Sequence, residues 1–383
     1  MTVKELIARS KAAQAEFAFA TQEQADAAAK AICKVVYDNA EKLGPMAAEE
    51  SRMGSEQDKI AKCRNKSALI WESLKDKKSC DIINRIEERR MIEVAKPVGV
   101  VASIIPSTNP VVTPMSNGAF ALKCRNSVIF APHPRAVKCT KLLVEMFRAE
   151  LKKLGLPEDL VLGLEEVSND LTSELMSAAD MVVATGGMGM VKAAYSSGKP
   201  AIGVGQGNVQ CIIDEDADIA DAVGKIIIGR AFDNGLICLG EQTVFVPEDK
   251  EAEFVAEMKK QGGYLVEGEE NVDKLREGLF PGGDAFSRVV VGMFADQVSD
   301  EIGLGAPKGT RVLFAKAKAL GAGDVLCREK LCPVIAYMTY KTFKEGVAMM
   351  EANLEHEGKG HSIAVHSNTP ENVEYAAIRC CVS

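Results

Sequence analysis

Residues 99–131 read GVVASIIPSTNPVVTPMSNGAFALKCRNSVIFA, and this stretch decides the fold. Two apolar runs rich in β-branched residues, at 99–105 and 127–131, predict buried strands. Between them, residues 113–123 predict a helix with Pro114 in its first turn, where a missing N–H has no consequence. A strand, a helix and a second strand in this order form the unit from which parallel sheets are built.

The same alternation continues outward from this stretch. On its C-terminal side the pattern predicts helices at 135–155 and 168–178, and strands at 160–164 and 181–185. On its N-terminal side, residues 1–80 predict successive helices, one of them capped by Thr21 with Gln24 as its capping-box partner. Residues 88–101 predict a hairpin that leads into a buried strand. We therefore expect a doubly wound, Rossmann-like α/β domain whose ligands bind at the carboxyl ends of the strands.

The pattern restarts in the second half of the chain. Residues 208–232 predict a strand, a turn and a helix, and further strands are expected at 243–247, 288–294, 310–315 and 334–340. We expect two domains. The first spans 1–206 and includes the N-terminal helices and a hairpin near 84–98. The second, also α/β, spans 207–383, and the glycine-rich stretch 202–208 joins them.

The composition excludes several classes of protein. The formal net charge is −8 and no basic run is present, so we expect no nucleic-acid partner. No apolar run reaches membrane-spanning length, so we expect no membrane partner. The 11 cysteines are scattered without a CxxC pair, which indicates reduced thiols and a cytoplasmic protein. The four histidines lack zinc-ligand spacing, so we expect no metal.

Polar residues follow two of the predicted strands of the first domain. Asn109 lies between two prolines in PSTNP, residues 106–110. Its amide could donate to a developing oxyanion, or it could fix a turn. His133, Pro134 and Arg135 follow the next strand. There, the histidine and the arginine could face an adenosine or a phosphate, or the segment could cap the next helix.

Two further motifs carry candidate chemistry. The stretch ATGGMGMV, residues 184–191, follows a strand and opens a helix. Its glycines could admit a phosphate to the helix N-terminus, but the GGxG spacing also suits a tight turn. Cys238, in FDNGLICLGEQ at 232–242, is either a nucleophile or a small buried apolar residue.

Taken together, the motifs resemble the aldehyde dehydrogenase superfamily, in its coenzyme-A-acylating branch. The resemblance runs from about residue 95 to the end of the chain, and more loosely through the N-terminal helices. The stretches TNPVVTPMSN and GKGHSIAVHSN look most like those of acylating succinate semialdehyde dehydrogenases. The matching stretches are PSTNP, NSVIFAPHPRA, ATGGMGMVKAAYSSGKPAIGVGQGN, FDNGLIC, EKLCPV and GKGHS. The resemblance implies a cofactor-binding domain at 1–206 and a catalytic domain at 207–383.

The resemblance also implies catalytic roles. Cys238 would be the nucleophile that attacks the aldehyde and then carries the acyl group as a thioester. Asn109 would supply the side-chain half of an oxyanion hole, with the Cys238 backbone N–H as the other half. His361 would exchange protons with the thiol of coenzyme A, or would only be packed at a domain crossover. The hairpin would serve oligomerisation, in a homodimer or homotetramer.

The cofactor implied is NAD or NADP, with coenzyme A as co-substrate. The residues implied in binding are Gly186, Gly187 and Gly189 at the pyrophosphate, Glu329 at the nicotinamide ribose, His133, Pro134 and Arg135 near the adenosine, and Gly203. Arg135 would favour either the 2′-phosphate of NADP or the phosphates of coenzyme A. Gly203 stands where hydrolytic relatives have the glutamate that activates water, so the thioester should survive until coenzyme A accepts the acyl group.

The expected substrate is succinate semialdehyde. The alternatives are an acetaldehyde or butyraldehyde enzyme, a hydrolytic or glutamyl phosphate reductase-like enzyme, and a truncated member without activity. Family members continue beyond the position of the last residues, CCVS, through a further strand. We therefore expect a truncated C-terminal segment and an edge strand that lacks its partner.

Overall fold

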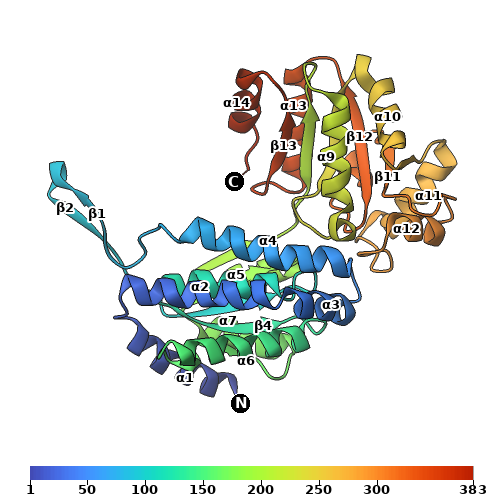
Figure 1. Ribbon diagram of the computed structural model, residues 1–383. Helices are drawn as coiled ribbons and strands as arrows, with labels where there is room; N and C mark the ends of the chain where they lie inside the picture. Colours follow the sequence, from blue (N-terminus) through green and yellow to red (C-terminus); the bar gives the residue numbers. More distant parts are fainter. Residues whose placement is uncertain (383) are drawn as a thin grey trace. The chain divides into compact units, whose positions relative to one another are not determined.

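The computed structural model describes residues 1–382. The chain divides into two compact units. Unit 1 comprises Met1–Arg52 and Glu56–Gly205, and unit 2 comprises Met53–Ser55 and the chain from Gln206 onward. Each unit is built around its own parallel sheet with helices packed on it (Figure 1). This confirms the predicted α/β fold class.

The sheet of unit 1 has five parallel strands in the order β5-β4-β3-β6-β7. The strands are β3 (Val100–Ile105), β4 (Ser127–Pro132), β5 (Val161–Gly163), β6 (Met181–Thr185) and β7 (Ala201–Val204). The chain proceeds from β3 through β4 to β5 on one side of the sheet, then returns to place β6 and β7 on the other side of β3. The order therefore reverses between β3 and β6, where doubly wound sheets bind their ligands.

Side chains that alternate along the strands fill both faces of this sheet. Val101, Ile105 and Phe130 belong to the core formed with α2, α5 and α6. Val100 and Ile129 belong to the core on the opposite face, with α1 and α7. The helices are α1 (Val3–Phe17), α2 (Gln22–Asp38), α3 (Ala40–Ser51), α4 (Glu56–Leu74), α5 (Val112–Lys123), α6 (Val137–Lys153), α7 (Asn169–Ala178) and α8 (Met188–Tyr195). The capping box of Thr21 and Gln24 at the start of α2 confirms that prediction.

A two-stranded antiparallel hairpin extends from unit 1, formed by β1 (Asp81–Ile86) and β2 (Met91–Ala95) (Figure 1). Both of its strands are largely exposed. The buried guanidinium of Arg125 anchors its base, because it donates to Asp81 on one strand and to the Ala95 carbonyl on the other. The hairpin thus begins slightly earlier than the predicted residues 84–98.

The sheet of unit 2 has six parallel strands in the order β10-β11-β12-β9-β8-β13. These are β8 (Val209–Ile213), β9 (Glu241–Pro247), β10 (Gly263–Leu265), β11 (Val312–Lys316), β12 (Val334–Tyr340) and β13 (Ile363–His366). Helices α9 and α10 share one core with this sheet, whereas α11 to α14 contribute to two others. The helices are α9 (Ile219–Ala231), α10 (Glu251–Lys260), α11 (Glu269–Leu279), α12 (Ala295–Ile302), α13 (Phe343–His356) and α14 (Pro370–Arg379).

One local prediction was wrong. Residues 288–294 form bends and turns instead of a strand. Val290 in this run is buried, but Val289 is 56% exposed. Gly292 has a φ of 68°, which interrupts the extended backbone that a strand requires. The stretch 202–208, expected to join the two domains, contains the step from unit 1 to unit 2 after Gly205, and its first residues belong to β7, which pairs with β6.

Two negative findings hold for residues 1–382. None of the helices described there combines the length and apolar character that a bilayer crossing requires. Within the same residues, no three His, Cys, Asp or Glu side chains are grouped so that they could hold a metal ion.

Candidate active site

Cys238 lies in a strained, exposed loop between α9 and β9. Three consecutive residues before it, Asp233, Asn234 and Gly235, have φ values of 50°, 52° and 72°. A left-handed conformation at a non-glycine residue costs of the order of 1–3 kcal/mol, so the surroundings must hold it. Asn234 is held by a 2.9 Å hydrogen bond from its Nδ2 to the carbonyl of Gly292. The loop therefore presents Cys238 outward from a buried, fixed base.

Gly207 is the point at which three segments of unit 2 converge. A β-carbon built on this glycine would stand 2.9 Å from His361 Nε2 and 3.0 Å from the Cys238 Cβ. The backbone N–H of Gly207 also donates to Glu329 Oε1, at 2.8 Å. Unit 2 thus brings together Cys238, His361 and Glu329, three of the predicted site residues, around one glycine that has no room for a side chain.

The two titratable partners at this point are both affected by burial. His361 is half-buried, and this lowers the pKa of its imidazole below 6.5. Its Nδ1 lies 2.8 Å from Ser362 Oγ, which leaves Nε2 as the nitrogen on the side of Gly207 and Cys238. Burial also raises the pKa of Glu329 above its usual value, although the hydrogen bond from Gly207 opposes this. The lowered pKa favours the uncharged imidazole at neutral pH, which is the form that can accept a proton.

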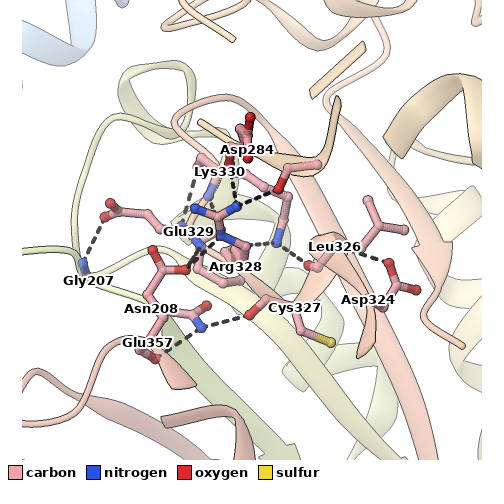
Figure 2. A network of polar contacts seen from close by, with 12 residues as sticks. Gly207, Asn208, Asp284, Asp324, Leu326, Cys327, Arg328, Glu329, Lys330 and Glu357 are labelled. Atoms are coloured by element: carbon pink, nitrogen blue, oxygen red, sulfur yellow. Dashed lines mark hydrogen bonds and ion pairs between the residues drawn. The ribbon is translucent and has the colours of Figure 1, made fainter. Parts of the chain in front are cut away.

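Glu329 lies in a dense polar network (Figure 2). Its backbone N–H donates to Glu357, which also pairs with the Arg328 guanidinium at 3.6 Å. Next to Gly207, Asn208 donates through Nδ2 to the carbonyls of Cys327 and Glu357. These contacts hold the backbone before Glu329, and the Lys330 N–H, which donates to Gln242 Oε1 at 2.9 Å, holds the backbone after it, so the carboxylate has a defined position.

Two buried basic side chains, Arg230 and Lys330, hold the segments that carry the site. Arg230 is fully buried and donates to the carbonyls of Lys330, Cys332 and Gly240. It therefore connects the loop of Cys238 to the segment that carries Glu329. Lys330 donates through Nζ to two carbonyls of the preceding turn, at 2.6 and 2.8 Å, and burial lowers its pKa to about 7.

The remaining predicted residues lie in unit 1, and most of them follow adjacent strands. Asn109 follows β3, the segment of His133, Pro134 and Arg135 follows β4, and the glycines of the GGxG turn follow β6. Because these three strands are neighbours and parallel, their loops share one edge of the sheet, beside the reversal of strand order. Gly186, Gly187 and Gly189 lead into α8, and β-carbons on the last two would meet nothing within 4 Å. This edge is therefore open to a ligand phosphate at the N-terminus of α8.

His133 and Arg135 are held in a tight turn. The His133 N–H donates to the Ile105 carbonyl, and the Arg135 N–H donates to His133 Nδ1 at 3.1 Å. Both side chains and that of Pro134 are exposed at this edge. In this position the segment could contact either an adenosine or a phosphate.

Gly203 lies within β7 and packs against α8. A β-carbon there would stand 2.7 Å from Val191 Cγ1 and 3.0 Å from Tyr195 Cε2, and the Gly203 N–H donates to the Tyr195 hydroxyl. Any side chain at this position would have to displace the side chains of Val191 and Tyr195 on α8. The packing of unit 1 therefore gives a physical reason for the absence of a carboxylate at residue 203.

Comparison with known proteins identifies the family. Residues 1–274 match the model of the aldehyde dehydrogenase family. The chain belongs to this family. It is 47% identical over 376 residues to the succinate-semialdehyde dehydrogenase (acetylating) of Clostridium kluyveri, which covers 98% of this chain and 83% of the relative. It is 40% identical to the sulfoacetaldehyde dehydrogenase of an Acholeplasma species, over 96% of this chain and 77% of that protein.

A solved structure of another aldehyde dehydrogenase has the same fold. The propionaldehyde dehydrogenase of Rhodopseudomonas palustris, crystallised with bound CoA and an acylated cysteine, is 28% identical. The match covers 98% of this chain and 85% of that one, with a TM-score of 0.85.

The sequence motifs did not predict every residue that shapes this aldehyde dehydrogenase site. Gly207 and Lys330 lie inside motifs that indicated the family. The spacing of these motifs does not indicate that Gly207 packs against Cys238 and His361, or that the Lys330 side chain is buried. Arg230 precedes the motif that contains Cys238, at the end of a helix whose apolar residues predict burial. The one available signal was a charged residue on that apolar helix face.

Proposed function

We propose that this chain is a CoA-acylating aldehyde dehydrogenase that works through a thioester on Cys238. It converts an aldehyde, NAD(P)+ and coenzyme A to an acyl-CoA and NAD(P)H, reversibly. The observation that carries this proposal is the convergence of exposed Cys238 and uncharged His361 at Gly207. A thiol beside a neutral imidazole can be activated for attack on a carbonyl carbon.

In the first half-reaction the Cys238 thiolate adds to the aldehyde carbon. A carbon–sulfur bond forms, and the π electrons of the carbonyl move to its oxygen. The amide of Asn109 and the backbone N–H of Cys238 would stabilise this oxyanion, and the loss of one such donor typically costs about 2.7–4 kcal/mol. When the oxyanion re-forms its double bond, the hydrogen leaves the carbon with its electron pair and a thioester remains on Cys238. The nicotinamide, when bound, accepts this hydride.

In the second half-reaction the acyl group moves to coenzyme A. His361 would take the proton of the coenzyme A thiol, and the resulting thiolate attacks the thioester carbon. The bond to Cys238 then breaks, Cys238 leaves as a thiolate, and acyl-CoA is released. Water competes poorly, because Gly203 supplies no carboxylate to activate it and the packing of α8 admits none. The kinetics should therefore be ping-pong.

The residues of unit 1 fit a dinucleotide. Gly186, Gly187 and Gly189 would let a pyrophosphate approach the N-terminus of α8, where the open space permits it. In unit 2, the anchored carboxylate of Glu329 would accept hydrogen bonds from the nicotinamide ribose. Exposed Arg135 would contact either the 2′-phosphate of NADP or the phosphates of coenzyme A.

The proposed substrate is succinate semialdehyde. The two relatives described above are named for succinate semialdehyde and sulfoacetaldehyde, and both are short aldehydes that carry an acidic group. This supports an anionic aldehyde over acetaldehyde or butyraldehyde. The choice is tested by a panel of these four aldehydes with each nicotinamide cofactor, in which the anionic aldehydes should give the highest kcat/KM.

We also propose that the hairpin mediates assembly into a homodimer or homotetramer. Ile82, Met91, Ile92 and Val94 are between 37% and 52% exposed on a ribbon of only two strands. Such a two-stranded ribbon is only marginally stable alone and exposes its apolar side chains to water, so a second copy would cover it.

The compartment follows from the chemistry of Cys238. The exposed nucleophile must stay reduced, which suits the cytoplasm.

The direct test mixes the protein with an aldehyde and NAD+, with and without coenzyme A. The proposal predicts a single burst of NADH without coenzyme A and sustained turnover with it. Sustained carboxylate formation without coenzyme A would instead identify a hydrolytic enzyme. No turnover from a folded protein would identify a non-catalytic member of the family.

A further inference from the structure

We propose that Lys62 is a positioning residue for Asn109. It holds the side-chain oxygen of the amide, and thereby directs the amide N–H toward the oxygen of the reacting aldehyde. This inference rests on the proposed role of Asn109 as an oxyanion donor. It assigns a function to a residue of α4, which carries none of the motifs described above.

The contact on which the inference rests joins two parts of unit 1. Lys62 is only 5% exposed on α4, and its Nζ lies 3.0 Å from Asn109 Oδ1. The backbone carbonyl of Asn109 accepts a hydrogen bond from the Thr113 N–H at the start of α5, at 3.3 Å. The asparagine is therefore held at its backbone by one helix and at its side chain by another.

The chemistry of lysine determines which way the amide faces. An ammonium group has three donors and no acceptor, so the amide atom that faces it must be the oxygen. If the amide rotated by half a turn, its NH₂ group would face the ammonium and two sets of donors would oppose each other. The NH₂ group must therefore point away from Lys62. It lies 3.5 Å from Thr108 Oγ1, at the limit of a hydrogen bond, and this contact leaves it able to donate elsewhere.

This arrangement matters because the reaction forms an oxyanion in each half. A donor stabilises developing charge best when it is already oriented before the charge appears. An asparagine that rotated freely would present its oxygen, an acceptor, to the oxyanion for part of the time. Hydrogen bonding of Oδ1 to a charged donor also polarises the amide and strengthens its N–H groups as donors. Lys62 thus acts on the reaction through Asn109.

The test is a double-mutant cycle of Lys62→Met and Asn109→Ala, measured at saturating substrates. Asn109→Ala should lower kcat by about 10²- to 10³-fold, the usual effect of losing one oxyanion donor. Lys62→Met should lower kcat by about 10-fold or more while the KM values for aldehyde and cofactor change little, since a mispositioned donor affects mainly the transition state. The double variant should be no slower than Asn109→Ala alone, because Lys62 has nothing left to position.

The controls separate positioning from stability. Lys62→Arg keeps a charged donor and should recover most of the activity, and Lys62→Gln should give an intermediate kcat if the methionine variant does not fold. Lys66→Met removes a half-buried lysine one turn further along α4 and should leave kcat unchanged. The thermal melting temperature of every variant shows whether the variant is folded and how stable it is.

The outcomes are distinct. If Asn109→Ala loses activity but the Lys62 effect multiplies with it, the inference is overturned and the proposed function stands. The same conclusion follows if the Lys62 variants fold and keep full kcat. If Asn109→Ala itself keeps full activity, the oxyanion role in the proposed function fails, and the inference fails with it.

Discussion

His361 Nε2 and Cys238 Cβ lie 2.9 and 3.0 Å from the position that a β-carbon on Gly207 would occupy. The two residues come from segments more than 120 positions apart, and a residue without a side chain lets them approach. The same glycine donates its backbone N–H to Glu329. A single position therefore holds the proposed nucleophile, the proposed proton acceptor and the proposed ribose ligand in one region of unit 2.

Substitution of Gly207 by alanine should separate these groups. The added methyl would collide with the imidazole, the Cys238 Cβ and the Cys238 carbonyl, which is 2.5 Å away. We expect kcat to fall by about 10²-fold, as a displacement of about 1 Å costs in other active sites. Steady-state kinetics beside thermal melting measure both effects. Gly224→Ala on α9 is the matched control, because its β-carbon meets mainly a flexible glutamine side chain; a Gly207→Ala enzyme as active as this control would contradict the packing.

The pH dependence of coenzyme A acylation should follow His361. Because burial lowers its pKa, the imidazole stays neutral down to a pH below 6.5. The rate of acyl transfer should therefore be flat near neutral pH and fall only on the acid side, with a midpoint below 6.5. His361→Asn should slow this step and remove that acid limb, while the NADH burst keeps its amplitude. Stopped-flow measurement of both half-reactions checks this; an unchanged acid limb in the variant would show that another group accepts the proton.

Arg230→Met should destabilise unit 2. The substitution removes a buried donor from the carbonyls of Lys330, Cys332 and Gly240, of which the first two keep a donor from Gln242 and Val334. We expect the free energy of unfolding to fall by about 1–3 kcal/mol, the usual effect of losing the partner of a buried polar group. Urea unfolding followed by circular dichroism measures the change. A loss well below 1 kcal/mol would mean that water replaces the guanidinium.

The hairpin should control oligomer size. The paired residues Ile82 and Val94 lie opposite each other on the ribbon, and Ile92 is two residues from Val94 in the same strand. The double substitution Ile92→Glu and Val94→Glu places charges on this apolar surface and should reduce the assembly to a smaller species. Light scattering coupled to size-exclusion chromatography measures the mass. Phe19→Glu, an exposed apolar residue elsewhere in unit 1, is the control, and an unchanged mass for the hairpin variant would exclude the ribbon as an interface.

The sequence predicted those parts of the fold that depend on local pattern. Buried strands such as β3 and β4 are continuous apolar runs, and the capping box of Thr21 and Gln24 depends on residues three apart, so both can be found without tertiary information. The run at 288–294 is also mostly apolar but forms turns, because Gly292 adopts a positive φ and its carbonyl accepts a hydrogen bond from Asn234. That acceptor role depends on a segment far away in the sequence.

The residues of the candidate site also fall into those that sequence motifs predict and those that only tertiary contacts reveal. Cys238, Asn109 and the glycines before α8 lie in motifs whose order along the chain indicates the family. The role of Gly207 in packing depends on three-dimensional convergence, and so do the burial of Arg230 and the contact between Lys62 and Asn109. Apart from the charge of Arg230 on an apolar helix face, no local pattern indicates these roles, because each residue acts on a segment distant in sequence.

The most direct test of the central claim is mass spectrometry of the protein after incubation with succinate semialdehyde and NAD+ in the absence of coenzyme A. If Cys238 is the nucleophile, one acyl group per chain should map to the peptide that contains Cys238 and should leave as acyl-CoA when coenzyme A is added. The Cys238→Ala variant should fold and remain unmodified. An acyl group on another residue, or full turnover by that variant, would show that Cys238 does not carry the thioester.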